Sequence, residues 1–328
     1  MNLPIEILNK LEELCYGKDK KDLAQNFRKI SDKYIGDKDG KSLLNKEVEA
    51  VTYAISRMPA TYGAVNTACK QIFESVCEDS NMKKDEFKTV IDVGAGTGAA
   101  TLALCEHVDL EEITCLEREK VMINMGQELF NASNHDVLKT SKWIQFDISE
   151  SDYNEKADIV IASYMINEFS DDKITQIIDK LWNMTNKLLI IVDPGTPKDY
   201  KRLLKIKEYL LEKNGNIIAP CMTKHGCDLP ANDWCHFVCR VERTKLQKEV
   251  KSADVPYEDE KFTYLAISKI SQNENMTEKR IIRHPIINTN QVKVKLCSKD
   301  GVIEKIYTKK DKEIYKKIKK AKVGDLID

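Results

Sequence analysis

The chain has 328 residues, a formal net charge of −1 and 32% charged residues. This length is enough for two or three domains, and the near-neutral balance excludes binding of a polyanion through bulk charge. No apolar run reaches the ~18 residues of a membrane span, and the N-terminus does not resemble a signal peptide. We therefore expect a cytoplasmic protein, whose ten cysteines are reduced thiols or metal ligands rather than disulfides.

Residues 1–88 are predicted to form a helical N-terminal cap. Apolar residues recur at helical spacing from Ile5 to Leu14, and further helices are predicted over 20–34 and 45–57. Another helix is expected to begin at Pro59, because proline suits a first helical turn. Arg57 and Tyr62 flank this proline; they either face a cofactor cleft or RNA, or they tie the helices to the sheet that follows.

The segment 89–98 reads Thr-Val-Ile-Asp-Val-Gly-Ala-Gly-Thr-Gly and predicts a buried parallel strand, a glycine turn and a helix beginning near Ala99. Gly94, Gly96 and Gly98 lack a Cβ, so a ligand can lie directly against the backbone. Free N–H groups at the start of the helix can hold an anionic group. The sequence therefore predicts a cofactor site at the carboxyl edge of a doubly wound sheet.

Two cofactors compete for this predicted site. The spacing Gly94-x-Gly96-x-x-Ala99 satisfies a dinucleotide fingerprint, which alone is a weak signal. The alternating glycines preceded by Asp92 resemble the first motif of class I S-adenosylmethionine-dependent methyltransferases. Glu117 ends a second strand (113–117) and would bind ribose hydroxyls with either cofactor. Asp147 follows a third strand (143–146), where methyltransferases place an acid on the adenine amino group, and it favours S-adenosylmethionine.

Strands and helices continue to alternate to residue 220, which predicts an α/β fold with a parallel sheet. Strands are expected over 157–164 and 187–195, and helices over 171–186 and 198–214. Ser163, at the end of the fourth strand, is counted among the cofactor-binding residues. The stretch that follows lacks the motif of amino methylases and the cysteine of cytosine-C5 enzymes, and Asn167 and Glu168 could simply cap the next helix. No catalytic residue is assigned.

Four cysteines fall within 19 residues of a loop containing Gly226 and Pro230. They are Cys221, Cys227, Cys235 and Cys239. Such clustering in a reducing compartment favours a metal site over buried or reactive thiols, although the spacing does not name the metal. Cys239 lies in an alternating apolar stretch and could belong to the core, which makes Cys297 the other candidate fourth ligand. His225 and His236 could ligate zinc, or they could be structural.

Several motifs occur in an order that resembles one family. They are residues 56–62, the glycine loop, residues 233–237, residues 240–243 and residues 256–264. The chain resembles a bacterial member of the methyltransferase-like small-ribosomal-subunit family, whose mitochondrial members are mitoribosome assembly factors. The resemblance covers most of residues 50–325. It implies a [4Fe-4S] cluster on Cys221, Cys227, Cys235 and Cys297, with zinc as the alternative metal. Such a cluster would be structural or redox-sensing and would pin the loop to the C-terminal part.

The C-terminal part is predicted to be a small β-domain with a basic helix. A short basic helix (243–251) and a strand closing the large sheet (261–267) precede a polar linker over 271–279. Three β-runs (280–286, 291–297 and 302–307) follow, and then a helix near 311–321. Its lysines, expected to contact RNA in view of the family, are Lys312, Lys316, Lys317, Lys319 and Lys320. The arginines that could extend this surface are Arg240, Arg243, Arg280 and Arg283.

Together these observations predict three parts: a helical cap (1–88), an S-adenosylmethionine-binding domain with the cysteine loop (89–270), and a small β-domain (271–328). We expect a monomer with no membrane partner that binds small-subunit ribosomal RNA during assembly of the small subunit and translation. The alternative is an active ribosomal RNA methyltransferase. A third possibility, a redox- or iron-gated regulator of assembly, has no sequence signature of its own.

Overall fold

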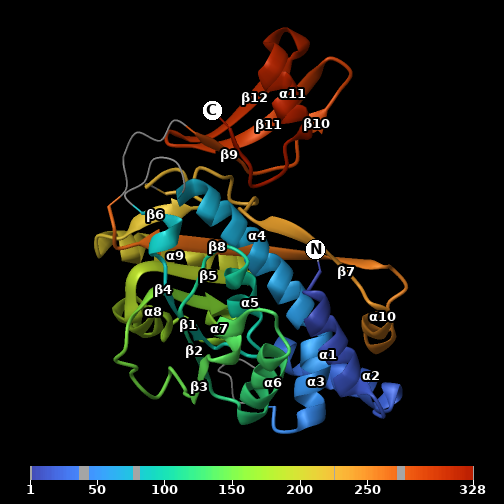
Figure 1. The fold of residues 1–328 in the computed structure, drawn as a ribbon. Helices are drawn as coiled ribbons and strands as arrows, with labels where there is room; N and C mark the ends of the chain where they lie inside the picture. The colour runs from blue at the N-terminus through green and yellow to red at the C-terminus, as the bar shows by residue number, and fades with distance from the viewer. Residues whose placement is uncertain (1, 37–43, 77–81, 225, 272–277, 328) are drawn as a thin grey trace.

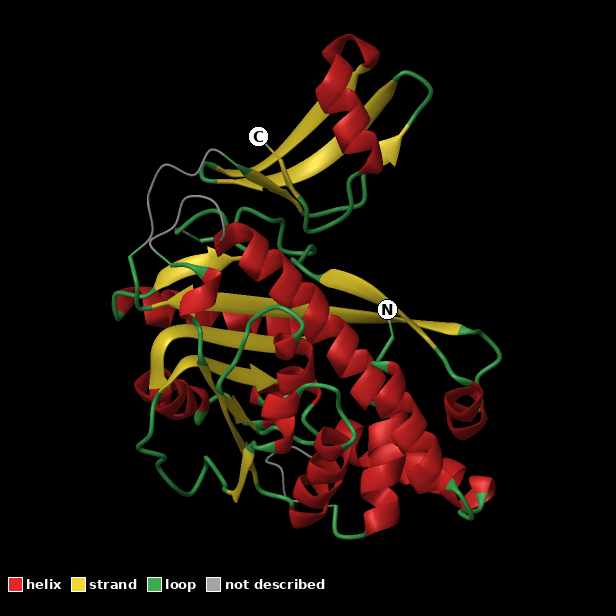
Figure 2. Cartoon of the chain, in the orientation of Figure 1, coloured by secondary structure: helices red, strands yellow, loops and turns green. Residues whose placement is uncertain are grey.

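We describe the protein from a computed structural model that covers residues 2–36, 44–76, 82–224, 226–271 and 278–327 (Figure 1). A large mixed sheet lies at the centre, flanked by helices on both faces, and a small sheet with one helix lies beyond one edge of it (Figure 2). Within these ranges, no helix is both long enough and apolar enough to cross a membrane.

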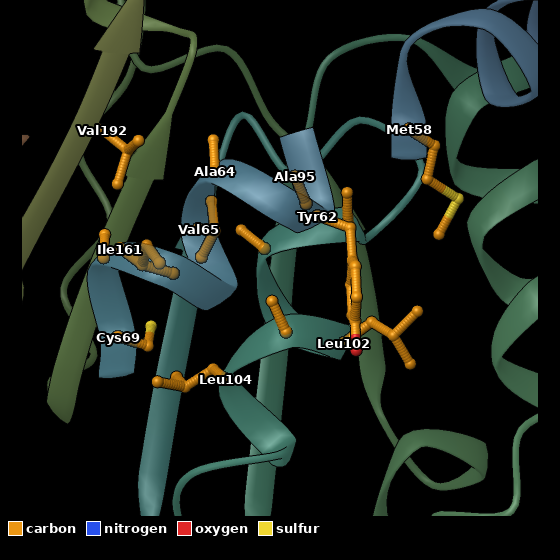
Figure 3. Packing of buried hydrophobic residues seen from close by; sticks show 14 of the residues in the cluster. Met58, Tyr62, Ala64, Val65, Cys69, Ala95, Leu102, Leu104, Ile161 and Val192 are labelled. Atoms are coloured by element: carbon orange, nitrogen blue, oxygen red, sulfur yellow. The ribbon is translucent and has the colours of Figure 1, made fainter. Parts of the chain in front are cut away.

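In the described residues, four α-helices precede the sheet. They are α1 (Ile5–Cys15), α2 (Lys20–Gly36), α3 (Glu47–Ser56) and α4 (Met58–Val76). The long helix α4 runs across one face of the sheet and packs on α5 (Ala99–Cys105), where Val65 and Leu102 belong to the same buried cluster (Figure 3). That cluster also contains Ile7 of α1 and Val192 of the sheet, so the N-terminal helices and the sheet share one core.

The first five strands of the large sheet are parallel. They are β1 (Thr89–Val93), β2 (Glu112–Glu117), β3 (Lys142–Gln145), β4 (Ala157–Ser163) and β5 (Thr185–Pro194). Between them lie α5, α6 (Lys120–Asn131), α7 (Asp136–Lys139) and α8 (Ile174–Met184), and α9 (Pro197–Glu212) follows β5. Neighbouring residues of a strand face opposite cores: Ile161 packs toward α4 and α5, whereas Val160 packs toward α8 and α9. Burial on both faces explains the apolar runs of β1, β2, β4 and β5, whereas the edge strand β3 is only partly buried.

The strand order β3-β2-β1-β4-β5-β8-β6 confirms the methyltransferase-type α/β fold expected from the sequence. The remaining elements are β6 (Asn216–Ala219), β7 (Phe237–Glu242), α10 (Lys245–Lys251) and β8 (Tyr257–Ser268). The expectation that the strand at 261–267 closes the sheet was wrong, because β8 is longer and lies antiparallel between β5 and β6. The strand β7 pairs with the first half of β8 and β6 with its last residues.

The C-terminal sheet has the order β10-β11-β9-β13, with β12 paired to β11. Its elements are β9 (Lys279–Ile281), β10 (Ile286–Ile287), β11 (Gln291–Ser298), β12 (Gly301–Thr308), α11 (Lys312–Lys320) and β13 (Leu326–Ile327). The single run expected over 280–286 is two short strands that pair with opposite ends of β11, along the edge that β12 leaves open. Pro285 lies between them and has no N–H for a strand ladder. The predicted linker falls largely on residues 272–277, outside the described residues.

Candidate cofactor pocket and cysteine centre

The glycine loop lies at the carboxyl end of β1, as the sequence predicts. Gly94, Gly96 and Gly98 have φ of 69°, 56° and 81°, a region that favours glycine. The Gly96 N–H donates to Glu117 Oε2 at 2.8 Å, and the Gly94 N–H donates to the Leu116 carbonyl at 2.8 Å. The loop is thus bonded to the end of β2.

A narrow cavity of about 80 Å³ opens beside this loop. Five of the seven predicted cofactor residues line it: Gly94, Gly96, Glu117, Asp147 and Ser163. They come from the ends of β1, β2, β3 and β4, which meet at one edge of the sheet. The cavity is smaller than most ligand pockets, so a cofactor would need side chains at its mouth to move aside.

The other two predicted residues support the loop from outside the cavity lining. Asp92 is fully buried, and the Thr101 hydroxyl and backbone N–H donate to its Oδ2 at 2.7 and 3.2 Å. This contact holds the start of α5 to β1. Burial raises the pKa of Asp92 to about 7. A Cβ added at Gly98 would lie 2.4 Å from the Phe130 ring, so the helix start is packed tightly against α6.

Carboxylates that the sequence analysis did not assign to the cofactor also line the cavity. Glu119 follows β2, and Glu168 lies in the segment after β4. Burial raises the pKa of both to about 7, and the neighbouring Glu117 carboxylate adds to each shift. Burial also raises the pKa of Glu117. The backbone N–H groups of Glu119 and Gly96 donate to its carboxylate and partly offset this increase. Glu168 was noticed in the sequence only as a possible helix cap.

Arg118 is the cation that lines this cavity, at 3.3 Å from Glu168 Oε2 and 4.0 Å from Glu119 Oε1. With Asp147, the lining therefore carries more carboxylates than cations. The Ser149 N–H and hydroxyl donate to Asp147 Oδ1 at 2.8 and 2.7 Å and fix that side chain at the rim. When ionised, the carboxylates give the cavity a negative potential suited to a cation.

The cysteine loop joins β6 to β7. Both of these strands pair with β8, and the loop leaves the sheet at the point along β8 where the pairing changes from β6 to β7. The thiols of the predicted ligand set interact electrostatically in every pairwise combination. They are Cys221, Cys227, Cys235 and Cys297. Burial and the neighbouring thiols raise the pKa of Cys221 to about 11 and also raise the pKa of Cys235 and Cys297. The structure thus brings together three loop cysteines and one from β11.

Three buried side chains surround these thiols, and the sequence analysis identified none of them in this role. The Tyr200 hydroxyl of α9 hydrogen-bonds to Cys227, which together with burial raises the pKa of the phenol. Lys207 of α9 and Arg280 of β9 are 1% and 0% exposed, and both act electrostatically to lower the pKa of Cys221 and Cys297. A buried cation favours thiolate over thiol, and thiolate is the form that binds metals.

The loop is anchored to both parts of the molecule. Asp233 accepts from Arg283 and, at 3.0 Å, from Lys295 of the small sheet. The Trp234 indole N–H donates to the Gly195 carbonyl at 2.9 Å, at the end of β5. Arg280 Nε donates to the Pro220 carbonyl at 2.9 Å. The thiols therefore lie where the loop, the large sheet and the small sheet meet.

The other candidate ligands lie apart from this group. Cys239 belongs to β7 with Phe237 and Val241, and it packs beside Gly63 of α4. Burial and the Glu260 carboxylate raise its pKa to about 12. His236 Nδ1 lies 3.0 Å from the Trp234 carbonyl and its ring stacks on that indole. His225 lies outside the described residues.

In the described part of the chain, no three histidine, cysteine or carboxylate side chains are grouped closely enough to hold one metal ion. The four thiols, one buried and three half-buried, therefore do not form a ready site for a single ion.

The expected RNA surface divides into exposed lysines and engaged arginines. All five α11 lysines are exposed, whereas Tyr315 and Ile318 of the same helix are buried. Arg280 cannot extend that surface, since it is fully buried. The other three arginines lie in ion pairs: Arg240 with Asp259, Arg243 with Glu258 and Arg283 with Asp233.

Arg57 and Tyr62 mainly join the helices to the sheet. Arg57 Nη2 lies 3.6 Å from Glu260 of β8, and its guanidinium lies 6.0 Å from the Tyr164 ring centre. Tyr62 is 4% exposed and belongs to the main core. Of the alternatives drawn from the sequence, the structure favours the structural one for Tyr62, while Arg57 also lines a second cavity.

The chain is similar in sequence to several known proteins. Residues 47–328 match the family described as "Mitochondrial small ribosomal subunit Rsm22". The chain is 21% identical over 307 residues to the human "Ribosome assembly protein METTL17, mitochondrial", covering 85% of this chain and 62% of that protein. It is 27% identical over 116 residues to a "Malonyl-[acyl-carrier protein] O-methyltransferase" of Acetivibrio thermocellus, covering 35% and 39%. The chain thus spans less than two thirds of either relative.

A solved structure from Methanococcus maripaludis, a "putative s-adenosyl-l-methionine-dependent methyltransferase", aligns with 71% of this chain and 99% of its own. The alignment has 14% identity and a TM-score of 0.44.

Proposed function

The chain belongs to the mitochondrial small ribosomal subunit Rsm22 family, and from this membership we propose that it is an assembly factor of the small ribosomal subunit. In this proposal it binds small-subunit ribosomal RNA, S-adenosylmethionine and a [4Fe-4S] cluster. The human relative's name supports the assembly role. The observation that carries the proposal is the group of four neighbouring thiols, one buried and three half-buried, drawn from two parts of the chain.

The charge of the cofactor cavity favours S-adenosylmethionine over a dinucleotide. Glu117, Glu119, Asp147 and Glu168 line it against Arg118. S-adenosylmethionine carries a sulfonium and an ammonium group, both attracted by carboxylates, whereas a dinucleotide would bring a pyrophosphate dianion among them. Glu117 would hold the ribose hydroxyls, and the backbone N–H groups of the glycine loop would face the methionine carboxylate.

The thiol group fits an iron–sulfur cluster better than zinc. Zinc needs ligands that converge tetrahedrally on one ion, and the described residues contain no such group. In a [4Fe-4S] cluster each thiolate binds a different iron, so the sulfurs lie farther apart. Lys207 and Arg280 are buried beside them, and a cluster with four thiolates is an anion that would stabilise these cations.

A cluster bound by four cysteines has no open coordination position, so its proposed contribution is structural and one-electron redox chemistry. This chain's residues would do the rest. Asp233 and Arg280 already attach the loop to the small sheet. A cluster bound to the thiols would link Cys297 of β11 covalently to the loop cysteines, and metal binding would then contribute to folding. The small sheet would present the exposed lysines of α11 to RNA phosphates.

The proposal is tested by metal analysis of anaerobically purified protein. Wild type is expected to hold about four irons and to absorb near ~400 nm, as brown iron–sulfur proteins do. Cys297→Ser should lose both signals. Cys239→Ser is the matched control, because Cys239 is a buried cysteine on β7, the strand that follows the cysteine loop, and it should keep both signals. One zinc per chain, or no metal with freely titratable thiols, would refute the cluster.

One observation favours the alternative of an active ribosomal RNA methyltransferase. Glu168 lines the cofactor cavity, and its raised pKa of about 7 suits a group that takes a proton from a methyl acceptor. Mass analysis of small-subunit RNA from a deletion strain separates the two functions. A methyl group that is lost on deletion and not restored by a Glu168→Gln gene supports the enzyme; an unchanged methylation pattern supports the binding role.

A further inference from the structure

A second cavity, of about 510 Å³, opens next to the cofactor cavity. It lies between α2, the junction of α3 and α4, the ends of β4 and β5, and the β7–α10–β8 hairpin. Its volume is in the range of small-molecule sites. No part of the proposed cofactor, cluster or α11 surface uses it.

The two cavities share a wall. Tyr53 and Tyr164 line both of them. Tyr164 has a φ of 54°, an uncommon conformation for a tyrosine, and its hydroxyl donates to Glu260 Oε1 at 2.8 Å. Backbone held in this region concentrates at functional sites. A ligand in the second cavity would therefore lie beside a cofactor in the first.

The lining combines aromatic rings with cations. Phe27, Tyr53 and Tyr164 supply the rings, and none of them is fully covered. Arg57, Arg243 and Lys251 supply the cations. Glu258 pairs with Arg243 and Lys251, and Glu260 lies 3.6 Å from Arg57, so these cations exceed their carboxylate partners by one charge.

Rings and cations together select the ligand. Unstacked nucleobases stack on aromatic side chains, and nearby Arg and Lys bind the connecting phosphate. A lysine- or arginine-rich peptide would meet the excess positive charge, and a neutral apolar ligand would leave it unpaired. Enzymes and binding proteins that hold single bases draw them out of the stack into such pockets.

We propose that the cavity lined by Phe27, Tyr53 and Tyr164 binds one unstacked nucleotide of single-stranded RNA, with the base against the rings and its phosphate beside Arg243 and Lys251. The inference rests on the proposed RNA partner and assigns it a second contact, separate from the lysines of α11. In this arrangement the base lies next to the cofactor cavity whether or not a methyl group is transferred.

The test uses the full chain and a fluorescein-labelled single-stranded RNA hexamer, without cofactor. Phe27 lines the second cavity and not the first. Phe27→Leu keeps an apolar side chain but removes the ring face, and should weaken binding about fivefold to 100-fold, the loss of one base stack. Phe27→Tyr keeps the ring and should bind within about twofold of wild type. Thermal melting of both variants checks folding.

A charge pair of variants and a crosslink complete the test. Arg243→Gln should weaken the hexamer severalfold, whereas Lys201→Gln, an equal charge change at a separate cavity between α8 and α9, should not. A 4-thiouridine in the hexamer should crosslink to Phe27, Tyr53 or Tyr164. Equal affinity of Phe27→Leu and wild type, or crosslinks confined to 312–320, would overturn this inference and leave RNA binding intact. Absence of RNA binding by wild type would overturn both.

Discussion

Gly98 and Gly17 provide a matched pair for testing how the glycine loop is stabilised. Both have left-handed backbone, with φ of 81° and 78°. A Cβ at Gly98 would lie 2.4 Å from the buried Phe130 ring, whereas a Cβ at Gly17 would have nothing within 4 Å. The two Gly→Ala substitutions therefore share the backbone cost and differ in the crowding.

The expected magnitudes follow from these two contributions. Alanine in the left-handed region costs about 1–2 kcal/mol, and this is the whole loss predicted for Gly17→Ala. Forcing a methyl group into a packed core costs about 1–3 kcal/mol more, so Gly98→Ala should lose about 2–5 kcal/mol of the free energy of unfolding. Phe130→Leu should make room for the methyl group and recover about 1 kcal/mol in the double variant.

Urea denaturation followed by circular dichroism measures these differences. Cofactor-free protein is used, so that binding does not contribute to the free energy of unfolding. Equal losses for Gly17→Ala and Gly98→Ala would refute the crowding argument. Additivity of Gly98→Ala and Phe130→Leu would show that the Phe130 ring is not the obstacle.

Three further predictions concern the two sites. Burial raises the pKa of Glu168 from 4.5 to about 7, so between these pH values the folded chain keeps a proton that the unfolded chain releases. Glu168 should therefore contribute about 2 kcal/mol to the fall in the free energy of unfolding from pH 5 to pH 8, beside the contributions of Asp92 and Glu119, whose pKa is also raised to about 7. The fall should be smaller by that amount in Glu168→Gln, and identical profiles would contradict this. Tyr200→Phe removes the hydroxyl bonded to Cys227 and should lower the cluster's reduction potential in a titration followed by electron paramagnetic resonance; an unchanged potential would exclude that bond. Asp233→Asn weakens the ion pair with Arg283 by about 1 kcal/mol and should speed proteolysis of the cysteine loop. An unchanged rate of proteolysis would show that this ion pair does not hold the loop in solution.

The sequence alone predicted the parts whose structure depends on near neighbours. Apolar runs between helical patterns predicted β1, β2, β4 and β5, because parallel strands inside a sheet are buried on both faces. The glycines at positions 94, 96 and 98 predicted a turn, and other residues do not easily adopt the positive φ that this turn requires. The alternation of Phe237, Cys239 and Val241 was already a hint that Cys239 faces the core, and the strand β7 bears this out.

Errors arose where pairing between distant segments decides the structure. A strand's own residues do not reveal whether it lies at an edge, and β8 was expected there although it lies between β5 and β6. Arg280 resembled a surface arginine in the sequence, but β9 buries it beneath the loop, where carbonyls of Pro220 and Gly324 accept its N–H groups. A buried arginine needs such acceptors, and they come from segments far along the chain.

The cysteine centre shows what the sequence determined and what only the tertiary structure determined. The sequence by itself indicated a thiol-rich loop, because clustered cysteines are visible as spacing, but spacing left both Cys239 and Cys297 as candidates for the fourth ligand. Tertiary structure separated them: β7 turns Cys239 toward α4, and the small sheet brings Cys297 to the loop. It also brought Tyr200 and Arg280 beside the thiols. Contacts between residues so far apart depend on the packing of whole elements, which local sequence patterns do not encode.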